Sequence, residues 1–273
     1  MSADKPRLVL LPLVQRVLRE RWKGLSGWIS GLIALITIQV SVYPTIRDSR
    51  EGWSDVTEQF PEAFRKIFRM QDYTSPVGYL STELFSFMIP LIFIGLATTW
   101  GARAGAEEEE MGTADVLLSL PVSRSSILRT RMVGALLVIC ATTMITTSAL
   151  WIGTTIVNMD VAVSQILQAA TACGLLAMIF GSLSVAVAAW SGHRGVGLGT
   201  GLGLAIATFV LYSLAPLVSA LEHLLPINPF DWTIGKSPLQ EGLDPLWSGV
   251  SGAFSLALSG IALWAYQHHD IAS

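Results

Sequence analysis

The sequence has few charged residues. They make up 14% of its 273 residues, compared with roughly 25% in an ordinary soluble domain, whereas hydrophobic residues make up 52%. This composition excludes a typical soluble protein and indicates an integral membrane protein whose surroundings are the lipid bilayer. The net charge of -3 gives no reason to expect a nucleic acid as a partner.

The sequence also lacks the residue patterns of a catalytic, nucleotide or metal site. Its two cysteines, Cys140 and Cys173, lie in apolar runs and predict neither a disulfide framework nor a zinc cluster. Residues 235–237, Gly-Lys-Ser, resemble the end of a phosphate-binding loop, but Phe230 stands where that motif requires glycine. No ionisable residue falls at the middle of an apolar run, Glu83 being at the edge of one. We therefore expect neither an enzyme nor an ion-coupled carrier, and we expect the driving energy to come from elsewhere.

Six stretches are long and apolar enough to cross a membrane, which takes about 20 residues at a rise of about 1.5 Å. They lie at about residues 24–43, 85–100, 132–157, 166–190, 195–217 and 247–266. The second is short unless residues 77–83 contribute to it. The sequence predicts an all-α integral membrane protein with a single transmembrane domain over residues 1–273.

The first 23 residues are expected to form a cytoplasmic, interfacial elbow helix. Leu11, Val14 and Leu18 recur at helical spacing, and the charged residues among them lie largely off that stripe. An apolar stripe on a charged segment is typical of a helix that lies in the membrane interface. The alternative is that this segment is only the cytoplasmic end of the first span.

The basic residues are unevenly divided between the two sides of the membrane. Eleven of the 17 lysines and arginines precede the first span or follow the second and fourth spans, whereas six lie on the other side, mostly among acids. The side with more basic residues is normally cytoplasmic. Both termini and the loop of residues 101–131 are therefore expected in the cytoplasm.

Two spans contain small or hydroxylated residues in a pattern. Thr143, Thr146 and Thr147 lie in the third span, where packing against a neighbouring helix is the default interpretation and a substrate path is the alternative. The fifth span opens with a series of alternate glycines, at residues 195, 197, 199, 201 and 203. Glycines four residues apart permit close helix approach, within the chain or across a dimer.

Residues 107–124, EEEEMGTADVLLSLPVSR, form the only long charged and turn-rich segment between two strongly apolar runs. Four glutamates are unfavourable at the negative C-terminal end of a helix and favourable at an N-terminus. We therefore expect Gly101 and Gly105 to break the chain and residues 107–110 to begin a new helix.

The remainder of this segment predicts a short helix between two long ones. Thr113 can cap a short helix with an apolar face, Pro121 ends it, and Ser123 can cap the next helix, which begins with Arg124. The apolar face consists of Val116, Leu117 and Leu118. Such a face requires a partner to cover it, although packing on the protein's own helix ends is the alternative.

This segment resembles a signature of the membrane subunits of type-2 ATP-binding cassette (ABC) transporters, which are mostly exporters. The matching residues follow the pattern E-x-GT-x-x-x-LLS-x-P-x-SR and are Glu110, Gly112, Thr113, Leu117, Leu118, Ser119, Pro121, Ser123 and Arg124. Residues 266–271 are similar to the family's aromatic, basic and Asp-Ile ending, with two histidines where basic residues are more usual. The resemblance covers nearly the whole chain.

The resemblance implies that residues 101–131 form a cytoplasmic coupling loop whose short helix docks on a separate ABC ATPase subunit. The implied contact residues are Glu109, Glu110, Gly112, Thr113, Val116, Leu117, Leu118, Pro121, Ser123 and Arg124. It further implies that ATP and magnesium bind in the ATPase and not in this chain. Two membrane subunits, identical or related, would form the path between them.

The expected location is a prokaryotic inner membrane, and the expected activity is export. The alternative function is a membrane scaffold or sensor subunit of an ATPase-driven complex that does not itself transport. Both functions predict the same coupling segment, so the sequence does not decide between them.

Overall fold

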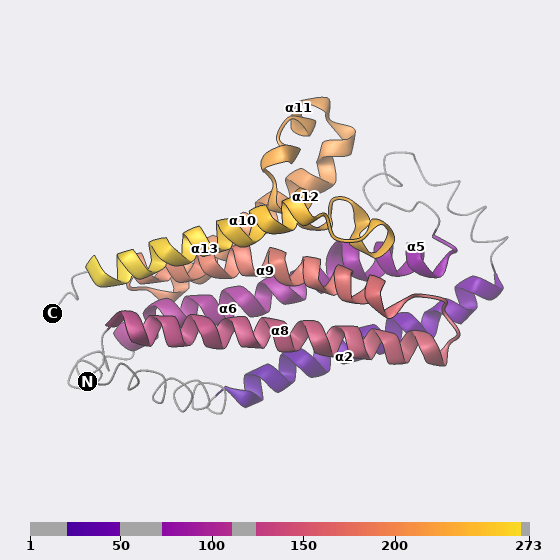
Figure 1. The fold of residues 1–273 in the computed structure, drawn as a ribbon, viewed down its shortest axis with the longest axis horizontal. Coiled ribbons are helices and arrows are strands. Elements are labelled where there is room, and N and C mark those ends of the chain that lie inside the picture. Colours follow the sequence, from indigo (N-terminus) through magenta and orange to yellow (C-terminus); the bar gives the residue numbers. More distant parts are fainter. Residues whose placement is uncertain (1–20, 50–72, 111–123, 269–273) are drawn as a thin grey trace.

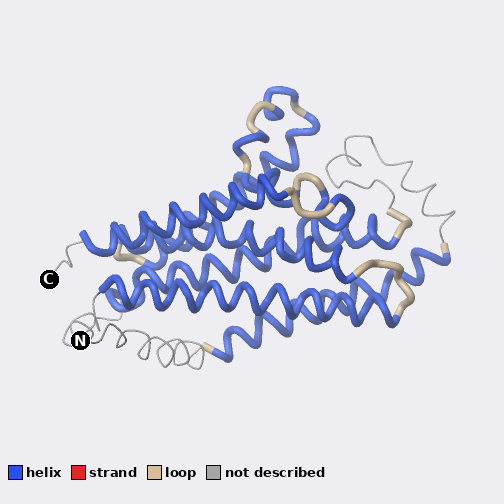
Figure 2. The backbone as a smooth tube through the Cα atoms, viewed as in Figure 1, coloured by secondary structure: helices blue, strands red, loops and turns tan. Residues whose placement is uncertain are grey.

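The computed structural model describes residues 21–49, 73–110 and 124–268, and every regular element in this part of the chain is helical (Figure 1, Figure 2). Among these described residues, six helical segments are long and apolar enough to cross a membrane. They are Trp22–Asp48, Pro76–Ala106, Ser125–Ile156, Val163–Ser191, Arg194–Leu217 and Pro245–His268. The predicted all-α protein with six spanning helices is therefore confirmed. The predicted interfacial helix lies almost entirely outside the described residues.

The second span is longer than its most apolar run. It consists of three consecutive elements, α5 (Pro76–Leu80), the π-helix η1 (Ser81–Met88) and α6 (Ile89–Glu110). Ser75 caps its start, because the Ser75 hydroxyl accepts a hydrogen bond from the N–H of Gly78 at 3.0 Å. Pro76 occupies the first helical turn, where a missing N–H removes no helical hydrogen bond. Residues 77–83 therefore contribute to this span.

The other five spanning helices are α2 (Trp22–Asp48), α8 (Arg124–Ile156), α9 (Val163–Ser191), α10 (Arg194–Leu214) and α13 (Pro245–His268). Helix α8 begins at Arg124, the residue at which the sequence predicted a new helix. A tight turn joins α9 to α10. There Gly192 has φ 67°, a conformation that side-chain-bearing residues rarely adopt, and it ends α9 in the usual way.

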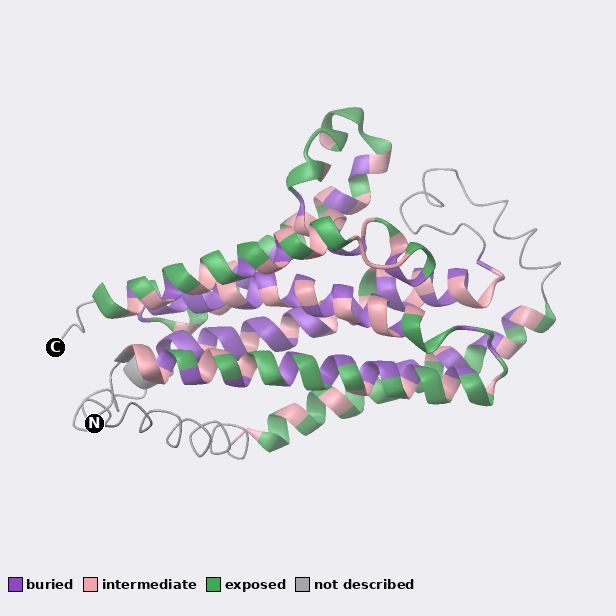
Figure 3. Cartoon of the chain, viewed as in Figure 1, coloured by how far each residue is buried: buried purple, intermediate pink, exposed green. Residues whose placement is uncertain are grey.

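Helix α9 is the centre of the bundle. Within its most apolar stretch 72% of the residues are buried, compared with 17% in α2 and 17% in α13 (Figure 3). Helices α6, α8, α10 and α13 all pack against α9. The outer faces of α2 and α13 remain apolar and exposed, as expected of surfaces that contact lipid.

The connection between α10 and α13 is a series of short helices, part of which projects from the bundle (Figure 1). They are η2 (Ala215–Leu217), α11 (Ser219–Glu222), η3 (Leu225–Ile227), α12 (Pro229–Ile234) and η4 (Ser237–Glu241). Asn228 anchors this connection, since its amide donates to the carbonyl oxygen of Thr208 at 2.8 Å and accepts from the N–H of Phe230 at 3.0 Å. The buried ring of Phe230 then packs among aromatic rings of the core.

An ion pair closes the same connection near the start of α13. The Lys236 ammonium lies 2.8 Å from the Asp244 carboxylate. This hydrogen bond raises the pKa of Lys236 and lowers the pKa of Asp244. Asp244 also accepts from the N–H of Leu246 at 2.9 Å and so caps α13. The lysine of the Gly-Lys-Ser sequence therefore has a structural partner within its own loop.

Helix α6 passes through Gly101 and Gly105 without interruption, so the predicted break at these glycines is wrong. Both glycines face α9. A Cβ added to Gly101 would meet the carbonyl oxygen of Gly181 in α9. One added to Gly105 would lie 2.7 Å from the Cβ of Ala188 and from the carbonyl oxygen of Val185. Glycine at these positions permits close approach of two helix backbones and does not form a turn.

The four glutamates at residues 107–110 consequently end α6 and do not begin a new helix. The prediction relied on the helix dipole, whose effect is only about 0.3–1 kcal/mol for each charge. Tertiary packing outweighs it, because Ala102, Ala104 and Ala106 are at most 2% exposed and extend α6 up to the acids. Arg131 of α8 adds a favourable contact there by donating to the carbonyl oxygen of Ala104 at 3.4 Å.

Candidate functional site

The predicted ATPase-contact segment connects α6 to α8 at one end of the bundle, which we call the α6–α8 end (Figure 1). The backbone places Glu109 and Glu110 in the last turn of α6 and Arg124 at the start of α8. The other predicted contact residues lie outside the described residues and are Gly112, Thr113, Val116, Leu117, Leu118, Pro121 and Ser123. The signature segment is therefore bounded by two long helices.

Basic side chains from several elements lie near the α6–α8 end. The Arg21 guanidinium, just before α2, is 5.4 Å from the centre of the Trp100 ring in α6, a favourable cation–π contact. The Nε of Arg103 is buried and has no hydrogen-bond partner within the described part of the chain. Arg194, at the start of α10, is close enough to Arg103 to repel its charge. Positive charge from Arg21, Arg103 and Arg194 is therefore concentrated near this end.

The three threonines of the third span lie inside the bundle. Thr143, Thr146 and Thr147 are all buried, with 9% exposure at most. Their hydroxyls donate to carbonyl oxygens one turn earlier in α8, at distances of 2.8–2.9 Å. Thr143 also faces Gly174 of α9. Helix packing accounts for these side chains, and the substrate-path alternative stays a prediction.

A polar cluster joins α2 to the second span near the opposite end of the bundle. The Glu83 carboxylate accepts from the hydroxyl of Tyr73 at 2.7 Å and from the side-chain amide of Gln39 at 3.3 Å. The hydroxyl of Tyr79 donates to the backbone carbonyl oxygen of Gln39 at 2.9 Å. Burial raises the pKa of Tyr73, and the adjacent Glu83 raises it further. Hydrogen bonds and tyrosine rings thus hold α2 to the start of the second span.

Glu83 stands out in the sequence at the edge of an apolar run, but its hydrogen-bond partners do not. Gln39 is 44 residues away in the chain, so no local pattern connects the two. A signal was nevertheless present, because an amide and a carboxylate in otherwise apolar runs each require a polar partner within the membrane. Pairing the polar residues of the first two spans would have found this contact.

Replacing Glu83 with alanine is expected to destabilise the protein by about 1.5–3 kcal/mol, because the hydrogen bonds of Tyr73 and Gln39 to a charged group are lost. The measurement is thermal or chemical unfolding of the purified protein in detergent micelles. Glu83→Gln, which keeps an acceptor for Tyr73, should lose less. An unchanged Tm for the alanine variant would show that this cluster does not secure α2.

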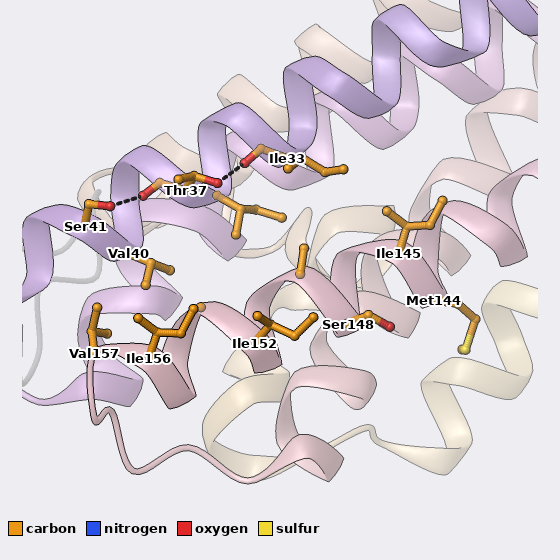
Figure 4. A pocket seen from close by; sticks show the side chains of 13 residues that line it. Ile33, Thr37, Val40, Ser41, Met144, Ile145, Ser148, Ile152, Ile156 and Val157 are labelled. Atoms are coloured by element: carbon orange, nitrogen blue, oxygen red, sulfur yellow. Dashed lines mark hydrogen bonds between the residues drawn. The ribbon is translucent and has the colours of Figure 1, made fainter.

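A groove with a cavity volume of about 640 Å³ opens between α2 and α8 (Figure 4). Aliphatic side chains from both helices form most of its walls, Ile33 and Ile152 among them. The hydroxyls of Thr37 and Ser41 on α2 bond carbonyl oxygens of their own helix at 2.8 and 2.7 Å. Among the described residues, no charged side chain lines this groove. Its chemistry suits an apolar occupant such as a lipid chain or another helix.

Comparison with known proteins identifies a family for this chain. The model of a family described as ABC-2 family transporter protein matches residues 13–250, from before α2 into α13. A search of curated proteins finds no match. The family match extends over most of the chain and includes the α6–α8 end with its signature segment. The chain therefore belongs to the ABC-2 family of transporter proteins.

Proposed function

We propose that this chain is the permease subunit of an ATP-driven exporter and that two membrane subunits form its path. The observation that carries the proposal is the family match over residues 13–250, together with the E-x-GT-x-x-x-LLS-x-P-x-SR sequence between α6 and α8. ATP and magnesium are assigned to a separate cytoplasmic ATPase. The uneven distribution of basic residues supports cytoplasmic termini, with the α6–α8 end in the cytoplasm.

The packing of α6 supports a role for its end in coupling. Helix α6 contacts the central helix α9 through Gly101 and Gly105, backbone against backbone. Helix α8 starts at the other side of the signature segment and also packs against α9. A displacement of residues 111–123 by an ATPase would therefore act on two long helices that share the bundle's centre, as rigid-body switching requires.

The alternate glycines of α10 lie along two edges of the helix, and this arrangement supports a dimer. Gly197 and Gly201 face α9, where a Cβ at 197 would lie 2.7 Å from the Cβ of Ala188. By contrast, a Cβ added to Gly195, Gly199 or Gly203 would meet no atom within 4 Å. One edge is thus used inside the bundle, and the other is a bare surface suited to close approach by a second membrane subunit.

Cysteine substitution on the bare edge tests this arrangement. With Cys140, which is exposed, replaced by serine, Gly199→Cys and Gly203→Cys should form crosslinked dimers in membranes. The yield should change when the cognate ATPase binds nucleotide, because switching moves the subunits relative to each other. Gly260→Cys on α13 is the control, since it also has open space around it but lies on a different helix.

Two results would count against the proposal. Equal crosslinking at Gly260→Cys would show that α10 is not a preferred contact surface. A midline between subunits that remains sealed in every nucleotide state would favour the scaffold or sensor function, which requires the ATPase contact but no path.

A further inference from the structure

A second groove lies where α8, α9 and α13 meet beside α6, and its cavity volume is about 350 Å³. Apolar side chains form most of its walls, including Met132 and Leu136 of α8 and Leu256 and Leu263 of α13. Within the described part of the chain, Arg129 is the one charged residue that lines it. This groove therefore differs from the one between α2 and α8, which has no charged residue in its lining.

The polar groups of this groove leave one cation available to a ligand. In its wall, the hydroxyls of Ser259 and Ser182 lie 3.4 Å apart and bond each other across α13 and α9. Arg129 is exposed, and its guanidinium forms no hydrogen bond or ion pair with another described residue. Of the groove residues on α8, Arg129 is nearest to the start of that helix. The groove is thus apolar along its length and positive towards the α6–α8 end.

The lining of the groove suits an extended apolar chain with an anionic head. Its lining on α8 covers residues 129–139, about 15 Å at about 1.5 Å for each residue. An anionic lipid matches both features of the groove, because its acyl chain can lie along the apolar wall while its phosphate reaches Arg129.

We infer that this groove binds a phospholipid with an anionic headgroup from the cytoplasmic leaflet, with an acyl chain along α8 and α13 and its phosphate on Arg129. The inference uses the cytoplasmic orientation argued in the proposed function and no step of transport. Basic side chains at the cytoplasmic surface attract anionic lipids, and one such contact corresponds to about a fivefold preference. The lipid would occupy a surface formed by α8, α9 and α13, separate from the bare edge of α10.

The test uses the purified full-length protein without ATPase or nucleotide. Native mass spectrometry should show one bound phosphatidylglycerol for each chain, preferred about fivefold over phosphatidylcholine with the same acyl chains. Arg129→Gln should remove most of that preference. Lys23→Gln, which removes one exposed positive charge at the same end but outside this groove, should retain it. Phosphatidylglycerol with a photoreactive acyl chain should label residues 132–139 and 256–263.

Equal preference in wild type and Arg129→Gln would overturn the inference, and so would an equal loss in Lys23→Gln, which would show that the preference does not belong to this groove. Photolabelling of wild type at other helices would overturn it without relying on any variant. None of these readouts requires transport or a dimer. A failure here therefore leaves the exporter proposal standing, and a sealed midline leaves the lipid site standing.

Discussion

Gly101→Val is expected to destabilise the protein by about 3 kcal/mol or more and to remove most of the correctly folded protein from the membrane. Overpacking a core typically costs about 1–3 kcal/mol, and sometimes more. The new side chain would meet the carbonyl oxygen of Gly181 and lie 3.2 Å from a methyl carbon of Val185. Both belong to α9, which is packed on most sides and has little room to move.

The matched control is Gly199→Val, which adds the same side chain to a glycine in open space. Size-exclusion chromatography of detergent extracts measures the yield of folded protein, and thermal unfolding measures its stability. We expect aggregation or a strongly lowered Tm for Gly101→Val and near wild-type folding for Gly199→Val. Similar behaviour of the two variants would show that the α6–α9 contact does not determine folding.

Leu117→Asp is expected to separate the membrane subunit from its ATPase. If Leu117 is a central apolar contact, burying a charge there should cost about 2 kcal/mol or more, which weakens binding about 30-fold. The measurements are copurification with the cognate ATPase and substrate-stimulated ATP hydrolysis. Both should fall together, because hydrolysis is coupled only in the assembled complex.

Ile227→Asp controls for the introduction of a charge on an exposed apolar side chain. Ile227 is 70% exposed in η3, in the connection between α10 and α13 and remote in sequence from residue 117. It should leave assembly and hydrolysis unchanged. Normal assembly and normal coupling in both Leu117→Asp and Leu118→Asp would refute the coupling role of this segment.

The spanning helices could be predicted because the membrane leaves the backbone few options. Inside the bilayer each backbone N–H and carbonyl needs an internal partner, so an apolar run of sufficient length becomes a helix whatever its neighbours are. Only the start of the second span required more information. Ser75 and Pro76 form an ordinary helix start. Polar residues between this start and the apolar run hid it from a search for apolar stretches.

The path of α6 could not be predicted from local sequence. A glycine has the same local helix propensity whether it ends a helix or allows a neighbouring helix to pack closely. Gly101 packs against Gly181, which is far away in the chain, so the local sequence does not show this contact. The helix dipole does favour acids at an N-terminus, but its effect is smaller than that of tertiary packing. The prediction of a break before residues 107–110 rested on local electrostatics, whereas tertiary packing determines where α6 ends.

For the candidate site, the signature segment was visible in the sequence because its residues are contiguous. The Glu83–Gln39 contact was not visible in the sequence, because it joins side chains of two different helices that are 44 residues apart in the chain. The π-helix η1 adds to this difficulty, since its wider turns shift which side chains face α2 relative to an α-helix. A site formed by one contiguous segment can be predicted from the sequence, whereas a site formed by residues from distant segments can be found only once the fold is known.

Bulky substitutions on the two glycine edges of α10 should respond differently to the expression level of the protein. Residues 197 and 199 point about 200° apart around the helix, so one edge faces α9 and the other faces open space. A bulky residue at 197 disturbs a unimolecular folding step, and no amount of added protein offsets it. If the bare edge is the proposed dimer contact, a bulky residue at 199 weakens association between two chains, an equilibrium governed by mass action, and a higher density in the membrane restores it. Expression level alone therefore distinguishes the two edges.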